Sequence, residues 1–182
     1  GHDPLSPTAT SVLQINVGKR CNQACHHCHV DAGPDRTEVM PDGIVDACLM
    51  LLEQAGVPTL DVTGGAPELH PRFREIVSRA RGLGRHVMDR CNLTIVTLPN
   101  YAGLPEFLAD HQVEVIASLP SFAASATDRQ RGDGVFQQSI DALRRFNALG
   151  YGVEGSGLAL NLVTNPTGAF LPASQASAEG EW

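Results

Sequence analysis

The sequence lacks three features, and each absence excludes a class of protein. No run of about 18 apolar residues is present, so we expect no helix that spans a membrane. The 13 Lys and Arg residues are outnumbered by 20 Asp and Glu residues, whereas binding to nucleic acid needs a basic surface. The opening residues, Gly1-His2-Asp3-Pro4, lack the apolar stretch of a signal peptide. We therefore expect a cytoplasmic protein that binds neither a membrane nor nucleic acid.

Cysteine is also scarce, with five in 182 residues, but three of the five lie close together. Cys21, Cys25 and Cys28 form a CxxxCxxC pattern directly after an apolar run at 12–17. A chain of this length folds without disulfides, so clustered cysteines indicate a metal site in a reducing compartment. Iron–sulfur clusters usually have four thiolate ligands. Three thiolates would leave one iron open to a small molecule, much as catalytic zinc sites keep an open position.

The same segment permits a second interpretation. Cys25 and Cys28 have the spacing of two zinc ligands. One nearby histidine would then help to complete a tetrahedral site: His26, His27 or His29. A structural zinc protein is therefore the alternative to an iron–sulfur protein.

Apolar runs typical of strands alternate with segments of helical periodicity along the chain. Strands are predicted at about 12–17, 59–63, 86–92, 113–119 and 158–164, and helices at about 42–55, 71–84, 104–110 and 135–149. This alternation predicts an α/β fold with a parallel sheet and right-handed crossovers. Residues 12–165 form the predicted core, 1–11 a flexible lead, and 166–182 an unstructured tail rich in Pro, Ala and Ser.

The first predicted helix has an apolar face that is expected to pack on the sheet. Its apolar residues recur at helical spacing: Ile44, Val45, Cys48, Leu51 and Leu52. Cys48 is therefore expected to be a core residue rather than a ligand.

Polar and glycine-rich segments follow the predicted strands at their carboxyl ends. In barrel-like α/β folds this is the edge that carries the active site. Five features are expected to meet there: the cysteine segment, Gly64-Gly65, Asn92, Ser118 and Asn161.

Together these motifs resemble the radical S-adenosylmethionine (SAM) superfamily, whose signature is CxxxCxxC after the first strand. The resemblance implies a partial TIM-like (β/α) barrel of parallel strands. It also implies a 4Fe–4S cluster held by the three cysteines, with SAM on the open iron and an external electron donor. Reductive cleavage of SAM would then give a 5′-deoxyadenosyl radical, the hard chemistry belonging to the cofactor.

The resemblance also implies which residues bind SAM. The segment Gly64-Gly65-Ala66-Pro67 occupies the place of the superfamily's Gly-Gly-Glu-Pro motif, with Ala66 where the family has Glu and a carboxylate at Glu68. Glycine permits close approach of the backbone to the SAM amino group. The remaining SAM contacts implied by the resemblance are Asn92, Ser118, Arg131 and Asn161. No residue is assigned a catalytic role beyond these contacts.

A narrower resemblance is to the arsenosugar-biosynthesis radical SAM proteins. It is carried by segments 16–34, 63–69, 89–94 and 129–136, which include Ala66-Pro67-Glu68 and Arg90-Cys91-Asn92. The resemblance implies that the 5′-deoxyadenosyl group is joined to a methylated trivalent arsenical. Cys91 is then either a packing thiol or a ligand that lines the pocket.

Members of that family continue into a Cys-rich C-terminal region, which is absent from this sequence. The barrel is therefore expected to be truncated after its fifth strand, leaving an unpaired edge. An alternative function follows from this: a truncated module that binds the cluster and SAM without turnover.

Overall fold

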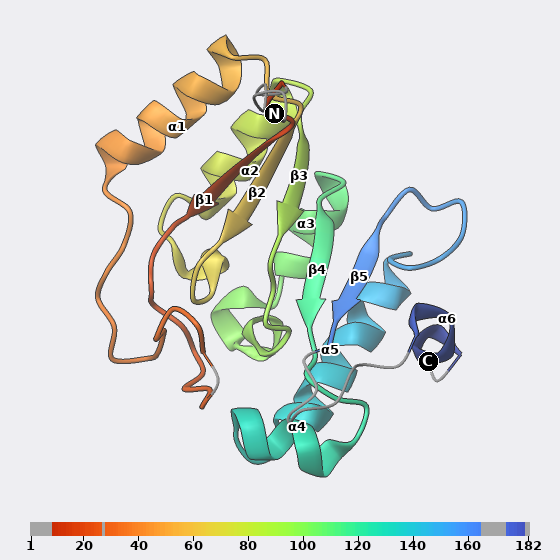
Figure 1. Cartoon of the computed structure of the whole chain (residues 1–182). Helices are drawn as coiled ribbons and strands as arrows, with labels where there is room; N and C mark the ends of the chain where they lie inside the picture. Colours follow the sequence, from red (N-terminus) through yellow and green to blue (C-terminus); the bar gives the residue numbers. More distant parts are fainter. Residues whose placement is uncertain (1–8, 27, 165–173, 181–182) are drawn as a thin grey trace, which may run out of the picture.

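Five parallel strands lie side by side in the order in which they occur in the sequence (Figure 1). The computed structural model describes residues 9–26, 28–164 and 174–180. The strands are β1 (Val12–Asn16), β2 (Thr59–Thr63), β3 (His86–Asp89), β4 (Glu114–Ser118) and β5 (Leu160–Val163). Each pairs in parallel with the next, in the order β1-β2-β3-β4-β5. The predicted α/β fold with a parallel, partial-barrel sheet is confirmed.

Helices connect the strands. The α-helices are α1 (Asp42–Gln54), α2 (Phe73–Gly82), α3 (Leu104–Asp110), α4 (Ala124–Arg131), α5 (Val135–Ala148) and α6 (Gln175–Glu179). Short 3₁₀ helices are η1 (Pro67–Leu69), η2 (Thr94–Thr97) and η3 (Pro99–Tyr101). Figure 1 shows α1, α2, α3 and α5 along one side of the sheet, and α4 beyond the carboxyl end of β4. No helix in the described ranges is long and apolar enough to cross a membrane.

The core lies between the sheet and these helices. Alternate strand residues point to the helical side, because successive side chains of a strand face opposite ways. The buried strand residues include Ile15, Leu60, Val62, Val87 and Val115. They pack with helix residues such as Leu49, Leu52, Ile76, Val77 and Phe146. Complete burial of one such side chain contributes about 1.5–3 kcal/mol, which holds the carboxyl ends of the strands at fixed positions.

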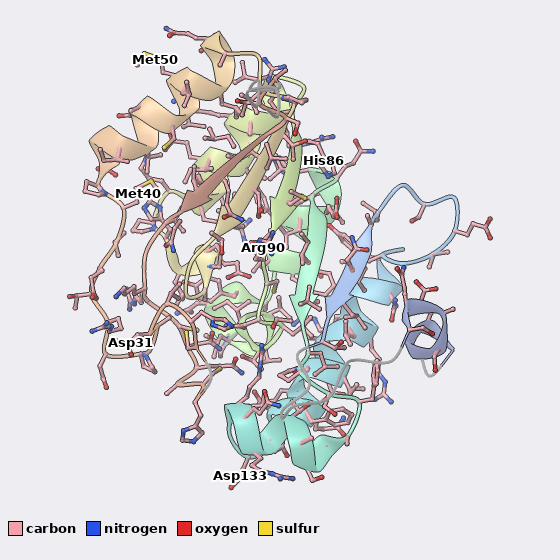
Figure 2. All side chains as sticks on the ribbon, in the orientation of Figure 1. Asp31, Met40, Met50, His86, Arg90 and Asp133 are labelled. Atoms are coloured by element: carbon pink, nitrogen blue, oxygen red, sulfur yellow. The ribbon has the colours of Figure 1, made fainter. Side chains whose placement is uncertain are left out.

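The other face of the sheet is polar. Asp61 on β2 is 3% exposed, and it accepts hydrogen bonds from Gln14 on β1 at 2.6 Å and from Arg90 at 2.8 Å. Figure 2 labels His86 and Arg90, which lie at the two ends of β3. This polar face would be the inside of a closed barrel, and it leads to the edge where the cysteine segment lies.

The predicted inner face of α1 is partly wrong. The buried residues of the helix are Val45, Leu49 and Leu52, whereas Ile44 and Leu51 are 52% and 49% exposed. Residues at i, i+4 and i+7 share a helix face, and this stripe selects Leu49 over Leu51. Cys48 is half-buried and packs against the core, as expected.

Two helices were not predicted. The buried residues of α4 are Thr127, Gln130 and Arg131, so the segment has no apolar periodicity that would have revealed it. Within the predicted tail, α6 forms at 175–179, so the expectation of an unstructured tail is wrong for that part. Residues 166–173 and 181–182 of the predicted tail, and residues 1–8 of the predicted lead at 1–11, lie outside the described residues.

Candidate functional site

A cavity of about 310 Å³ lies at the carboxyl ends of the strands. Small-molecule sites span about 300–1,000 Å³, so this cavity lies at the small end of that range. Predicted site residues that line it are Cys21, Cys25, Cys28, Gly64, Gly65, Asn92, Ser118 and Arg131. The structure thus brings together side chains from four strand ends and from α4.

The cysteine loop follows β1 and is held by backbone hydrogen bonds. Its Cys21 N–H donates to the Gly33 carbonyl at 3.1 Å, and its His26 N–H donates to the Gln130 carbonyl in α4 at 3.1 Å. Burial raises the pKa of the Cys21 and Cys25 thiols. The protein alone therefore favours neutral thiols, and a bound cation would favour the thiolates.

Backbone N–H groups point at two of the three sulfurs. The Gln23 N–H donates to Cys21 Sγ at 3.4 Å, and the Ala32 N–H donates to Cys28 Sγ at 3.3 Å. Hydrogen bonds of this kind stabilise sulfur that carries negative charge, as it does when bound to iron.

Gly64 and Gly65 lie where the cysteine loop crosses the end of β2. The Gly65 N–H donates to the Gly18 carbonyl, and the Ala66 N–H donates to the Arg20 carbonyl, both at 2.9 Å. A Cβ atom at Gly65 would lie 2.5 Å from the Arg20 carbonyl oxygen and 2.9 Å from the Ala32 Cβ. Glycine is therefore required at 65 for the loop to approach β2, whatever ligand the cavity holds.

Asn92 lies at the cavity wall, but its side chain is engaged by the protein. Its amide nitrogen donates to Asn22 Oδ1 at 2.7 Å and to Cys21 Sγ at 3.5 Å. Its Oδ1 accepts from the Ile95 N–H at 3.1 Å and from the Thr94 hydroxyl at 3.3 Å. This arrangement makes Asn92 a support of the cysteine loop, and the SAM contact that we expected of it stays a prediction.

Arg131 reaches the cavity from the last turn of α4. Its Nη2 donates to the Ser118 hydroxyl, which joins the two predicted SAM contacts. Its Nε and Nη1 are buried and have no hydrogen-bond partner among the residues that the structure describes. Burial lowers the pKa of Arg131, while the nearby thiols act in the opposite direction. Arginine stays charged in proteins, so its free N–H groups are suited to an anion.

Two predicted SAM contacts are absent from the cavity wall. Ala66 is 3% exposed and lies behind the Gly-Gly segment, because its N–H pairs with the cysteine loop. Asn161 lies nearer the amino end of β5, and its side-chain amide donates to Glu114 Oε1 at 2.7 Å. The residue of β5 that lines the cavity is Val163, two positions further along and therefore nearer the carboxyl end.

Sequence reasoning passed over Arg90 and Gln23, which also line the cavity. Arg90 directly follows β3 and lies two residues before Asn92 in the sequence. This position could have identified it as a site residue. Gln23 lies between two cysteines of the motif, is 7% exposed, and has a side-chain amide nitrogen with no hydrogen-bond partner among the described residues. Burial of such a polar side chain cannot be read from the sequence.

Comparisons with known proteins agree with this architecture. The model of the Radical SAM superfamily matches residues 15–166. The AdoMet-dependent heme synthase of Oleidesulfovibrio alaskensis is 28% identical over 137 residues, which cover 72% of this chain and 34% of the relative. The mycofactocin maturase MftC of Mycobacterium tuberculosis is 29% identical over 131 residues, covering 72% and 33%.

A similar fold occurs in the crystal structure of Streptococcus suis SuiB bound to S-adenosylmethionine. The TM-score is 0.67 at 16% identity, over 85% of this chain and 34% of SuiB. At this identity the likeness concerns the fold alone.

The chain belongs to the radical SAM superfamily, because the family model covers most of its length. The cofactors of this family are a 4Fe–4S cluster and SAM, as we expected. The chain spans about a third of the length of the curated relatives it matches.

Proposed function

We propose that this chain is the radical-generating core of a radical SAM enzyme. Cys21, Cys25 and Cys28 hold the 4Fe–4S cluster, and the adjoining cavity binds SAM. The observation that carries the proposal is the shared cavity: three thiols and a buried guanidinium with free N–H groups face the same space.

The spread of the three thiols favours a cluster over a single zinc ion. Ligand atoms of a tetrahedral zinc lie about 3.3–3.8 Å apart, given bond lengths of about 2.0–2.3 Å. In the described part of the chain, the cysteine loop contains no three Cys or His ligand atoms within 4.8 Å of one another. A cluster of four irons is wider than one ion and fits ligands that are further apart.

Arg131 and Ser118 supply the anion-binding side of the cavity. The Nε and Nη1 of Arg131 have no partner among the described residues, so either N–H group is available to donate a charge-assisted hydrogen bond to the SAM carboxylate. The Ser118 hydroxyl fixes the guanidinium from the other side. When bound, the reduced cluster supplies the electron that cleaves SAM to methionine and a 5′-deoxyadenosyl radical.

Gly64, Gly65 and Asn92 act by holding the cysteine loop in place. The glycines let the loop lie directly on the end of β2, and Asn92 ties Cys21 to the exit of β3. These contacts present the three sulfurs on one wall, which leaves the rest of the cavity for SAM.

For the whole protein, we propose that the radical is joined to a methylated trivalent arsenical. The support is the resemblance of segments 16–34, 63–69, 89–94 and 129–136 to arsenosugar-biosynthesis proteins. The other candidate is a module that binds the cluster and SAM without turnover. Its support is that the chain spans about a third of its relatives.

The first test is an electron paramagnetic resonance spectrum of the anaerobically reconstituted, dithionite-reduced chain, with and without SAM. We expect a reduced 4Fe–4S signal that shifts when SAM is added. The Cys25→Ala variant should lose the signal, and Cys48→Ser, a cysteine outside the cavity, should keep it. Bound zinc without an iron–sulfur signal would overturn the proposal. SAM cleavage without adenosylation of dimethylarsinous acid by the full-length protein would refute the arsenical alone.

A further inference from the structure

Two carboxyl groups and one thiol meet at the wall of the cavity. Glu68 comes from η1 after β2, and Asp89 and Cys91 come from the end of β3. One ligand atom of each lies within 4.8 Å of the other two, and all three residues are buried. Asp89 and Cys91 have no exposed surface, and Glu68 is 4% exposed.

Among the described residues, no basic side chain pairs with either carboxylate. All four oxygen atoms of Glu68 and Asp89 are buried, and the two carboxyl groups face each other and the Cys91 thiol instead of a cation. The contrast with Asp61 is clear, since that buried carboxylate is bonded to both Arg90 and Gln14. An isolated buried carboxylate is strongly disfavoured, and two together are worse, so the site requires either a cation or protons.

The pKa values of the three groups are all raised, in agreement with the lack of a positive partner. Burial raises the pKa of Glu68 to about 7. Burial raises the pKa of Asp89 as well, and the charge of Glu68 raises it further. The pKa of the Cys91 thiol is raised by burial and then by the two carboxylates. In the part of the chain that the structure describes, no basic side chain offsets this at either carboxyl group.

We propose that Glu68, Asp89 and Cys91 form a second metal site, which binds a zinc-class divalent cation separately from the iron–sulfur cluster. Two carboxylates and one thiolate are all accepted ligands of zinc, and three protein ligands leave a fourth position for water. Separations below 4.8 Å need to contract only slightly to reach the roughly 3.3–3.8 Å of a tetrahedral site.

Cys91 lies at the boundary between the cavity and the proposed site. Cys91 lines the cavity, whereas Glu68 and Asp89 do not, so the thiol lies between the cavity and the two carboxylates. The Leu93 N–H donates to Cys91 Sγ at 3.3 Å, which supports a charged sulfur. Leu93 adopts a φ of +67°, a conformation that is costly for leucine, directly beside the proposed site.

The test is zinc uptake by the anaerobically reconstituted chain, in which the cluster occupies the cysteine loop. After equilibration with zinc and removal of the excess, we expect one equivalent of zinc in addition to the cluster iron. X-ray absorption at the zinc edge should show one sulfur and otherwise oxygen neighbours. This measurement needs no variant, and it distinguishes the site from the three-sulfur loop.

Variants locate the ion. Cys91→Ser and Glu68→Gln should lose the zinc and keep the iron, and Cys48→Ser, a half-buried cysteine on α1, should keep both. No zinc retained by the unmodified chain would overturn the proposal and leave shared protons as the solution. Zinc with three sulfur neighbours would overturn it too, because the ion would then be in the cysteine loop. Neither result depends on whether SAM is cleaved.

Discussion

The side-chain amide of Asn92 donates a hydrogen bond to Cys21 Sγ at 3.5 Å, and this bond ties the exit of β3 to the cysteine loop. The same amide bonds to Asn22, and Asn22 donates to the Thr94 hydroxyl at 2.8 Å. These hydrogen bonds join Cys21 and Asn22 to a segment 70 residues further along the chain, and they anchor the loop there.

Replacing Asn92 by leucine should make the midpoint potential of the cluster more negative. Leucine has a similar volume but no N–H group, and hydrogen bonds to cluster sulfurs stabilise the reduced, more negative state. A redox titration followed by electron paramagnetic resonance measures the shift. The matched control is Asn161→Leu, since Asn161 bonds to Glu114 and does not line the cavity. An unchanged potential in Asn92→Leu would contradict the assigned role.

Replacing Gly65 by alanine should displace the cysteine loop. The added Cβ would meet the Arg20 carbonyl at 2.5 Å and the Lys19 carbonyl at 2.8 Å, and both are backbone atoms that cannot rotate away. We expect incomplete cluster loading and a loss of stability of about 1–3 kcal/mol, as for other overpacked sites. Iron content and denaturant unfolding measure the two effects.

Gly43 offers the control for this substitution. It lies in α1, and a Cβ there would meet nothing within 4 Å. Gly43→Ala should raise stability by up to about 1 kcal/mol through helix propensity, with full iron content. Equal loading of the cluster in both variants would show that the loop does not need its close contact with β2.

The sheet could be predicted from the sequence because each strand is an apolar run that ends in a polar or glycine-rich segment. Parallel strands place those endings at one edge, so the meeting of Cys21, Gly64 and Ser118 followed from the order of the elements. The positions of Ala66 and Asn161 could not be predicted in this way. Their contacts depend on which neighbour each side chain or N–H group meets, and periodicity does not contain that information.

The cluster of Glu68, Asp89 and Cys91 was missed for a related reason. Glu68 was noted as a displaced family carboxylate, and Cys91 as either a packing thiol or a pocket ligand. Their contact with Asp89 arises because η1 folds back over the end of β3, which no local pattern indicates. The unpredicted α4 illustrates the same limit, since its buried face is polar.

Arg72 links α1 to α2, and its contribution to stability should depend on pH. Its Nη2 lies 2.6 Å from both Asp46 Oδ1 and Glu75 Oε1, and this guanidinium holds the pKa of Glu75 below its usual range. A carboxyl group with a lowered pKa in the folded state adds stability above its unfolded pKa of about 4.3, and this is lost as pH falls. Arg72→Gln should therefore lower Tm at neutral pH, with the difference shrinking in acid.

Thermal unfolding between neutral pH and roughly pH 3 tests this, with values chosen around the ordinary carboxyl pKa. The control is Arg79→Gln, because Arg79 faces the same Glu75 at 3.9 Å and makes a weaker pair. A difference in Tm that stayed constant into acid would mean that Arg72 acts by packing alone.

Replacing Arg131 by lysine should weaken SAM binding while leaving the cluster in place. Lysine keeps the positive charge but loses the N–H groups on Nε and Nη1, which have no hydrogen-bond partner among the described residues. Charged hydrogen bonds contribute about 1.5–3 kcal/mol, so we expect the Kd for SAM to rise roughly 10- to 150-fold. Calorimetric titration of the reconstituted chain with SAM measures this Kd.

Arg129→Lys is the matched control, since Arg129 lies on the same helix but is exposed and does not line the cavity. Equal SAM affinity in the two variants would remove Arg131 from the binding site and leave the Ser118 contact as its role.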